Sequence, residues 1–301
     1  MSHSNRYLMC QPDYFDVRYI INPWMAGNVN RTSANLAFQQ WQNLYEIIAQ
    51  HAEIELIDPE PGLPDMVFTA NAGFVFEDKI LLSRFYHPER RGEEPHFDRW
   101  LAEHKYEVMK SPPEMPFEGA GDALIDREHP WIWAGYGWRS SLESHAYLKK
   151  AAELEVISLR LVDDRFYHLD TCLCPLENGY IMYYPAAFAE ESRRLIAQRI
   201  PLEKRIEVPE QDAVEFACNA VNIGRLVILN KSSCELAERL NQAGFEVAQT
   251  ELSEFLKAGG AAKCLTLRLN EPLLYLQRLF NSSHIQQLPD NPDEIFEALL
   301  D

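Results

Sequence analysis

The chain has 301 residues, a formal net charge of −18 at pH 7 and a hydrophobic fraction of 47%. Such an acidic surface disfavours nucleic acid and anionic membranes as partners, since both attract Lys and Arg. No stretch approaches the roughly 18 consecutive apolar residues of a membrane span, and the six cysteines lack the dense spacing of a secreted disulfide scaffold. The first residues also lack the basic and apolar regions of a secretory leader. We therefore predict a cytoplasmic globular protein.

The first predicted elements are a strand and a helix. Residues 6–10 form an apolar run that is typical of a strand. Over residues 32–52 apolar side chains recur near helical spacing, with Thr32 or Ser33 as the predicted cap. These apolar residues are Leu36, Phe38, Trp41, Leu44, Ile47 and Ile48. Further helices are predicted over residues 89–104, 141–153, 190–199, 233–243 and 290–301.

Between the helices a β-hairpin pattern recurs about every 50 residues, a period typical of solenoids, propellers and arrays. Each copy places one small residue before an apolar strand, a turn and a second apolar strand. In the third copy, the predicted strands 171–176 and 180–184 flank the turn residues Asn178 and Gly179. The marked residues are Asn71, Asp122, Asp170, Asn219 and, in a truncated last copy, Cys264. Five copies that carry different side chains indicate a closed ring that delivers one reagent per copy.

The domain organisation is predicted to be simple. No Gly-, Ser- or Pro-rich linker divides the chain, so we predict a single α/β domain over residues 1–301. Its core is expected to cover residues 6–270. Residues 271–301 are expected to form a C-terminal extension that ends in the predicted helix over 290–301.

The segment from His168 to Cys174 alternates polar and apolar residues, which in a strand would place the polar ones on one face. Histidine, aspartate and cysteine are metal-ligand types. Alternate strand residues lie about 6.6 Å apart, however, so the two ends of this segment could not surround one ion. We predict no metal site. His168 and Asp170 either flank a small bound molecule or have a purely structural role.

A second candidate segment follows the Pro-rich loop at residues 111–117. Gly119 and Gly121 permit close approach of a ligand, while Glu118 and Asp122 provide anionic acceptors. The segment is therefore either a ligand-binding turn or an ordinary acidic turn. Its carboxylates disfavour phosphate.

The third candidate is Cys264, which follows the small residues 259–262 and Lys263. The small residues are expected to leave room for a substrate and to offer free backbone amides. Lys263 is expected to favour the thiolate, because a positive neighbour lowers the pKa of a cysteine. Cysteines within apolar strand patterns are predicted to be packing residues. These packing cysteines are Cys10, Cys172 and Cys174.

Five co-linear segments carry a resemblance to a known family. They are residues 64–71 (PDMVFTAN), 117–122 (FEGAGD), 135–141 (GYGWRSS), 168–170 (HLD) and 259–264 (GGAAKC). In this order they resemble the guanidine-modifying (pentein, amidinotransferase-like) superfamily over residues 7–269. That superfamily includes arginine deiminases, dimethylarginine dimethylaminohydrolases, amidinotransferases and arginine dihydrolases. The resemblance implies a fivefold pseudosymmetric β/α propeller, in agreement with the repeat.

The resemblance also implies roles for residues in these segments. Cys264 resembles the nucleophile and His168 the general acid/base. Glu118 and Asp170 resemble the carboxylates that hold a guanidinium group. Together these four residues would make a site for nucleophilic attack on a cationic carbon centre.

The remaining matched residues are expected to bind the rest of an amino acid substrate. Arg90 and Arg139 resemble the arginines that bind the α-carboxylate, and Asp65 matches a position near the α-amino group. One position departs from the common pattern, because Asn71 stands where deiminases and dimethylaminohydrolases have an aspartate. This amide and the early segment around Asn22, which we assign to substrate binding, most resemble the arginine dihydrolases.

The resemblance therefore implies hydrolysis of L-arginine to ornithine, carbon dioxide and two ammonia molecules through a covalent adduct of Cys264, with no cofactor. Other activities stay open. A deiminase or dimethylaminohydrolase would stop at citrulline, an amidinotransferase would need an amine acceptor, and a non-catalytic ring would only bind. The expected partner is the small-molecule substrate, and association into a homo-oligomer is left open. Asn219 has no assigned role.

Overall fold

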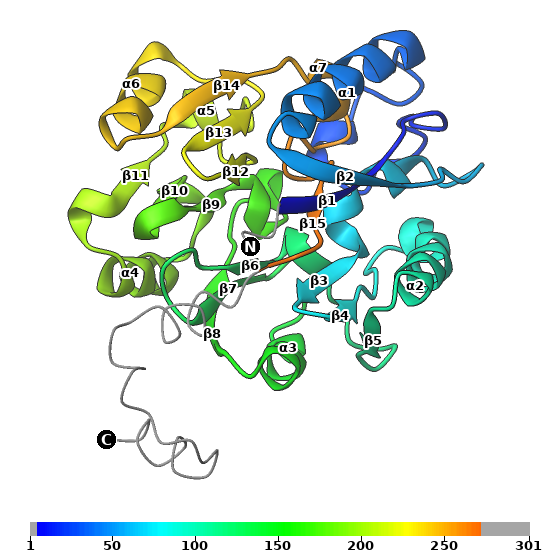
Figure 1. Cartoon of the computed structure of the whole chain (residues 1–301), viewed down its shortest axis with the longest axis horizontal. Helices are drawn as coiled ribbons and strands as arrows, with labels where there is room; N and C mark the ends of the chain where they lie inside the picture. Colours follow the sequence, from blue (N-terminus) through cyan, green and yellow to red (C-terminus); the bar gives the residue numbers. More distant parts are fainter. Residues whose placement is uncertain (1–4, 272–301) are drawn as a thin grey trace.

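Five three-stranded sheets surround a common centre, and the longer helices lie outside them (Figure 1). The computed structural model describes residues 5–271, so the predicted extension and the helix over 290–301 lie outside the described residues. In each sheet a first and a second strand are antiparallel, and a third strand is parallel to the second. The prediction of a single α/β domain with a fivefold β/α propeller is confirmed.

Four of the sheets come from consecutive stretches of the chain, as the repeat predicted. The first sheet contains β3 (Gly73–Phe76), β4 (Lys79–Leu82) and β5 (Glu107–Lys110). The second contains β6 (Ala123–Ile125), β7 (Trp131–Tyr136) and β8 (Glu155–Arg160). The third contains β9 (Leu173–Leu176), β10 (Tyr180–Tyr183) and β11 (Arg205–Glu207). The fourth contains β12 (Val221–Ile223), β13 (Leu226–Leu229) and β14 (Glu246–Gln249).

The fifth sheet joins the two ends of the described chain. Strand β15 (Leu267–Arg268) pairs antiparallel with β1 (Asn5–Cys10), and β1 pairs parallel with β2 (Ala52–Ile57). The backbone N–H of Leu269 also donates to the carbonyl oxygen of Arg6 at 2.8 Å. The last repeat contributes only β15 to this sheet. The start of the chain supplies the second and third strands, β1 and β2.

A helix connects the two parallel strands of every sheet, because a parallel pair needs a long crossover. These helices are α1 (Ala34–Ala49), α2 (Glu94–Glu103), α3 (Ser144–Ala152), α4 (Glu190–Arg199) and α6 (Cys234–Gln242). Two one-turn helices, α5 (Glu210–Ala213) and α7 (Ser253–Leu256), lie before β12 and before β15. The helix predicted over 89–104 is wrong in its first part, since Pro88–Glu93 forms a separate 3₁₀ helix.

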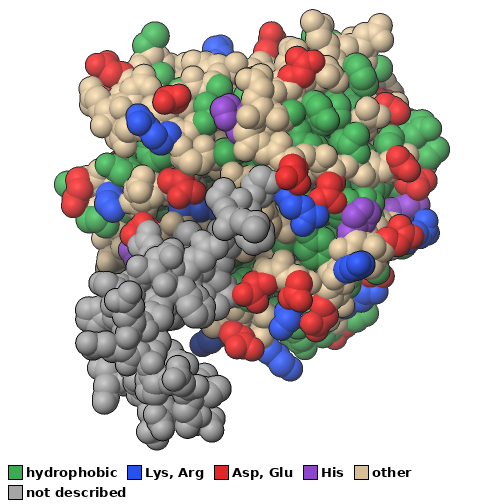
Figure 2. Space-filling model, viewed as in Figure 1, with side chains coloured by type: hydrophobic (Ala, Val, Ile, Leu, Met, Phe, Trp, Pro, Cys, Tyr) green, Lys and Arg blue, Asp and Glu red, His purple; other side chains and the backbone are tan. Residues whose placement is uncertain are grey.

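Helix α1 shows how the predicted apolar face corresponds to burial. Ser33 caps it, and Trp41, Leu44 and Ile48 are buried against the fifth sheet and its neighbours. Leu36 and Phe38 were counted in the apolar face but are 37% and 44% exposed. Figure 2 shows hydrophobic side chains gathered on the surface where Figure 1 places α1 and β2.

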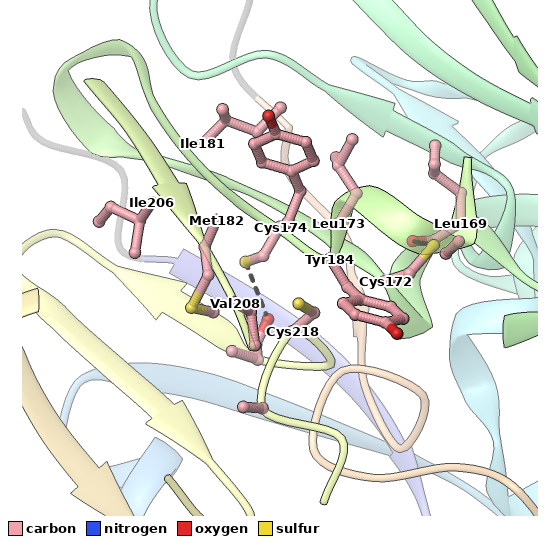
Figure 3. Packing of buried hydrophobic residues seen from close by; sticks show 14 of the residues in the cluster. Leu169, Cys172, Leu173, Cys174, Ile181, Met182, Tyr184, Ile206, Val208 and Cys218 are labelled. Atoms are coloured by element: carbon pink, nitrogen blue, oxygen red, sulfur yellow. Dashed lines mark hydrogen bonds between the residues drawn. The ribbon is translucent and has the colours of Figure 1, made fainter. Parts of the chain in front are cut away.

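The predicted packing cysteines lie inside the protein. Cys172 and Cys174 are buried in the third sheet's core beside Leu173, Met182 and Cys218 (Figure 3). Burial raises the pKa of Cys174 to about 12, so its thiol stays protonated. The prediction that these cysteines are packing residues is confirmed, and Cys10 is likewise buried.

Acidic side chains are spread over the face of the protein in Figure 2, with Lys and Arg interspersed. Within residues 5–271 no helix is both long enough and apolar enough to cross a membrane.

Candidate active site

The five marked residues of the repeat all lie just before the first strand of a sheet. The marked residues of successive copies lie next to one another. Backbone and side-chain hydrogen bonds then link each sheet's start to the next in a closed ring. The linked pairs are Asn71 with Glu118, Asp122 with Leu169, Asp170 with Asn219, Asn219 with Cys264, and Cys264 with Ala70.

A small pocket opens at this end of the ring. Seven of the nine predicted site residues line it, which are Asn22, Asp65, Asn71, Arg90, Arg139, His168 and Cys264. The other two, Glu118 and Asp170, lie directly behind His168 and Cys264 and contact them. The structure therefore brings all nine predicted residues together.

Cys264 is held from two sides by its neighbours. Its backbone N–H and its Sγ both contact the side-chain amide of Asn219, each at 3.1 Å. Its Sγ also lies 3.6 Å from Oδ2 of Asp170. Gly260 packs tightly beside it, since a Cβ at this residue would lie 2.6 Å from the ring of Phe68 and 3.1 Å from the Cys264 Cβ. A residue larger than glycine at position 260 would therefore disturb the packing around Cys264.

The sequence-based expectation for the reactivity of Cys264 is corrected in two respects. Burial, assisted by the charge of Asp170, raises the pKa of the Cys264 thiol well above its usual value, and Lys263 opposes this only weakly. The effect of Lys263 is small, and its side chain lines a different cavity from the one that contains Cys264. The backbone amides are also not free, since those of Ala261, Lys263 and Cys264 bond to Asn219.

His168 and Glu118 form a buried pair. Nε2 of His168 lies 2.7 Å from Oε2 of Glu118, which also accepts from Arg139 at 3.1 Å. Oε1 of Glu118 accepts from the backbone N–H of Tyr86. Burial opposes ionisation of Glu118, but Arg139 and His168 outweigh it and hold the pKa of this carboxyl well below its usual range. An ionised Glu118 accepts a hydrogen bond from the Nε2–H group of His168, and in the neutral imidazole this leaves Nδ1 able to accept a hydrogen bond.

The strand predicted from residue 171, which was to place His168 and Asp170 on one strand face, is wrong at its start. Leu169–Thr171 forms a 3₁₀ turn, and strand β9 begins only at Leu173. The turn arises because the Asp122 carboxylate accepts the Leu169 backbone N–H at 3.0 Å, which directs the chain away from the sheet. His168 and Asp170 therefore reach the pocket from a turn, and the strand-spacing argument does not apply to them.

Arg90 and Asn71 occupy one wall of the pocket. Arg90 forms a bidentate ion pair with Glu93, at 2.9 and 2.8 Å, and donates to Oδ1 of Asn71 at 2.8 Å. Nδ2 of Asn71 donates to the Glu118 carbonyl at 3.2 Å. A larger residue at Gly121 would displace the Asn71 amide, because a Cβ there would lie 2.4 Å from that same Nδ2 atom. Both ends of the Asn71 amide are thus oriented by the protein.

Asp65 and Arg139 also line the pocket. Oδ2 of Asp65 accepts from Tyr19, but Oδ1 is buried without a hydrogen-bond partner among the described residues. Arg139 donates to the Ile21 carbonyl at 2.9 Å and stacks over the Tyr167 ring, 4.4 Å from its centroid. An unpaired buried carboxylate oxygen is costly, so it marks a place for a donor from outside the protein.

Asn22 has all its polar atoms occupied by the protein. Its Oδ1 caps a 3₁₀ helix by accepting from Trp24 and Met25. Its Nδ2 donates to the Ala258 carbonyl at 3.0 Å and to Tyr167 at 3.3 Å. Asn22 therefore fastens the segment over residues 11–33 to the loop that precedes Cys264, and its predicted contact with substrate stays a prediction.

Two residues of the site were missed by the sequence analysis. Asn219 contacts the sulfur of Cys264, and Tyr167 stacks on Arg139 and donates to the Gly259 carbonyl at 2.7 Å. Asn219 carried a usable signal, since it occupies the marked position of the fourth repeat. For Tyr167 the only signal in the sequence was its position next to His168.

The buried carboxyl of Asp170 predicts a dependence of stability on pH. Burial raises the pKa of Asp170 to about 7, so between pH values of about 4 and 7 the folded protein binds this proton more tightly than the unfolded chain. Its contribution to stability is therefore lost as the pH rises through that window. Relative to wild type, Asp170→Asn should gain roughly 2–3 kcal/mol between the two ends of the window. Urea unfolding at a series of pH values measures this difference, and a difference that is flat with pH would contradict it.

Comparisons with known proteins identify a matching family and similar relatives. Residues 20–270 match the family described as N,N dimethylarginine dimethylhydrolase, eukaryotic. The bifunctional arginine dihydrolase/ornithine cyclodeaminase AgrE of Nostoc sp. is 58% identical over 273 residues, which make up 91% of this chain but only 39% of that protein. The N(G),N(G)-dimethylarginine dimethylaminohydrolase of Mycobacterium tuberculosis is 39% identical over 268 residues, 89% of this chain and 86% of that protein.

A solved structure matches nearly the whole described chain. The N-terminal domain of ArgZ, an arginine dihydrolase from the ornithine-ammonia cycle in cyanobacteria, superposes with a TM-score of 0.89 at 57% identity, over 89% of this chain and 99% of that one. That crystal contains the C264S variant bound to substrate, and a second contains an N71S variant covalently bound to a reaction intermediate. The two substitutions have the residue types and numbers of Cys264 and Asn71 in this chain.

Proposed function

This chain belongs to the N,N dimethylarginine dimethylhydrolase family of the pentein superfamily, and from this premise we propose that it is an arginine dihydrolase. The proposed reaction converts L-arginine and water to ornithine, carbon dioxide and two molecules of ammonia. The 58% identity to the bifunctional Nostoc protein supports this activity over the others in the family.

The observation that carries the proposal is the set of charged groups in the pocket. Cys264 lies beside the carboxyl of Asp170. Arg90, Arg139 and Asp65, with its unpaired carboxylate oxygen, line the same pocket. A molecule with a guanidinium at one end and an α-amino acid group at the other complements these charges, because each of its charged groups then meets the opposite sign.

In the first half-reaction Cys264 attacks the guanidinium carbon. The cation next to Asp170 offsets the burial that keeps the thiol protonated, which favours the thiolate. A carbon–sulfur bond forms, the carbon–nitrogen bond to a terminal NH₂ group breaks, and His168 protonates the departing ammonia. His168 then takes a proton from water, which attacks the adduct, and the carbon–sulfur bond breaks to give citrulline.

In the second half-reaction Cys264 attacks the ureido carbon of the retained citrulline. The bond to the δ-nitrogen breaks, and His168 protonates the amine so that ornithine leaves. Water then displaces sulfur from the carbamoyl adduct, and the carbamate breaks down to carbon dioxide and ammonia. In both halves Glu118 orients His168 through the hydrogen bond to Nε2.

Arginine labelled at the guanidinium carbon tests the proposal directly. A dihydrolase releases the label as carbon dioxide, with two ammonia molecules for each ornithine. Label that stays in citrulline would instead indicate a deiminase, and no turnover of arginine would also contradict the proposal.

Methylated arginine is the second candidate substrate. It is favoured by the 39% identity to the Mycobacterium tuberculosis dimethylaminohydrolase over 86% of that protein's length. Release of dimethylamine from asymmetric dimethylarginine, faster than ammonia release from arginine, would support this candidate.

We place the catalytic unit in one domain with its core at residues 6–270 and an extension at 271–301. It is proposed to act in the cytoplasm, where the six cysteines stay reduced, and the proposed steps use water and side chains without a cofactor. Association into a homo-oligomer stays a prediction.

A further inference from the structure

We propose that Asn219 controls the reactivity of Cys264, as a hydrogen-bond donor to its sulfur and as the clamp of its loop. The inference rests on the proposed cysteine chemistry and extends it to a residue outside the matched motifs. Asn219 is completely buried, two residues before strand β12. It therefore approaches Cys264 from the neighbouring sheet of the ring.

Asn219 first fixes the backbone of the nucleophile loop. Its Oδ1 accepts from the backbone N–H groups of Ala261 and Cys264, each at 3.1 Å. Its own carbonyl oxygen accepts from the backbone N–H of Lys263 at 3.2 Å. One residue thus holds three amides of a six-residue loop, and this fixes the direction in which the Cys264 side chain leaves the backbone.

The other end of the same amide acts on the sulfur. Nδ2 of Asn219 lies 3.1 Å from Sγ of Cys264 and 3.0 Å from the carbonyl oxygen of Asp170. A side-chain amide has two N–H donors and one oxygen with two lone pairs, so these four contacts use its full capacity. The amide cannot rotate without losing bonds at both ends, and an N–H group therefore always faces the sulfur.

This donor matters because the surroundings of Cys264 otherwise oppose a thiolate. Burial and the charge of Asp170 both raise the pKa of the thiol, and the hydrogen bond from Asn219 lowers it. In the proposed reaction Asp170 forms an ion pair with the guanidinium group of the substrate. Between the two half-reactions this cation is replaced by neutral citrulline. Asn219 is the donor to sulfur that is present in both half-reactions.

Asparagine suits this position better than its closest isostere. Aspartate would keep the two bonds from the Ala261 and Cys264 amides, but it would place a second negative oxygen against the sulfur and against the Asp170 carbonyl. Asn219→Asp therefore changes the charge and donor while it retains shape. Asn219→Ala removes the donor without adding charge.

The test measures the pH dependence of Cys264 alkylation by iodoacetamide in the full chain without substrate, by mass spectrometry of the peptide that contains Cys264. Asn219→Asp should raise the midpoint by about one pH unit or more, which is roughly a tenfold loss of thiolate at a fixed lower pH. Asn219→Ala should shift it in the same direction. In both variants kcat for arginine should fall by about 100-fold with a smaller change in KM.

Asn222→Ala is the matched control. Asn222 is also buried in the fourth sheet, but its amide bonds to Glu177, Gly224 and Leu226 and does not contact Cys264. Its alkylation midpoint should equal that of the wild type. Unchanged midpoints in folded Asn219 variants would overturn the proposal. Loss of folding in both Asn219 variants, with Asn222→Ala folded, would overturn it too, because the amide would then serve structure alone.

The alkylation readout separates this inference from the proposed function. If the midpoint shifts but the wild type does not turn over arginine, the proposed function fails and the role of Asn219 stands. If the wild type converts arginine to ornithine and no midpoint shifts, the function stands and the role of Asn219 fails.

Discussion

Replacing Cys264 with serine should reduce arginine turnover by about 10⁴-fold or more while arginine still binds. Serine retains the shape of the side chain but has a far less acidic group. In the part of the chain that the structure describes, no hydrogen bond joins His168 to Cys264, so the proposed general base does not contact the group that serine would replace. Steady-state assays measure the loss of turnover, and calorimetric titration with arginine measures the retained binding.

A matched control for this variant is Cys174→Ser. Cys174 is also buried and bonded to a carbonyl, that of Ala220, but it lies in the third sheet's core. Its replacement should change stability with little effect on kcat. Full turnover in Cys264→Ser, or an equal loss in both variants, would contradict a covalent mechanism at Cys264.

Asn71→Asp should convert the enzyme to a citrulline producer, with ornithine formation reduced by about 100-fold. Arg90 can still bond one carboxylate oxygen, but the second oxygen would face the Glu118 carbonyl, where the amide now donates. This repulsion favours rotation of that oxygen towards a cationic ligand. Two carboxylates, at residues 71 and 170, would then hold the guanidinium tightly and neutral citrulline poorly, so citrulline would leave before a second attack.

The products of Asn71→Asp are measured by chromatography of citrulline and ornithine over time. Asn230→Asp is the control, because Asn230 also donates to a carbonyl and accepts from an amide, those of Glu215 and Leu252, outside the pocket. It should still yield ornithine. If Asn71→Asp also yields ornithine without accumulating citrulline, the account of the amide is wrong.

The sequence was sufficient to predict the five-part ring and the residues that meet in the pocket. The period of the hairpins follows from local patterns, namely apolar strands, turns and helices, and the motifs lie at fixed positions within each period. The site residues were assigned from the resemblance of these motifs to the guanidine-modifying superfamily, because the spacing alone does not show which residues meet. Asp65, Asn71 and Cys264, which lie in the first and last copies, do line one pocket.

The contacts between sheets could not be predicted from the sequence. The bond from His168 to Glu118 joins residues 50 positions apart, and that from Asn219 to Cys264 joins residues 45 apart. No local pattern encodes which atoms meet across such distances. The raised pKa of Cys264 was not predicted for the same reason. Burial depends on all the neighbouring sheets, and its effect on this pKa is larger than that of the adjacent Lys263.

The closure of the ring by β15 and β1 has a consequence for how the protein is made. The hydrogen bond from Leu269 to Arg6 joins residues near the two ends of the described chain. Strand β1 can therefore pair with β15 only when synthesis of this domain is nearly finished. Cys264 lies three residues before β15, so the nucleophile loop is also among the last parts of the described chain to be synthesised. We therefore expect a nascent chain to build four sheets without a working nucleophile. The buried thiol next to Asp170 would then arise only in the last folding step.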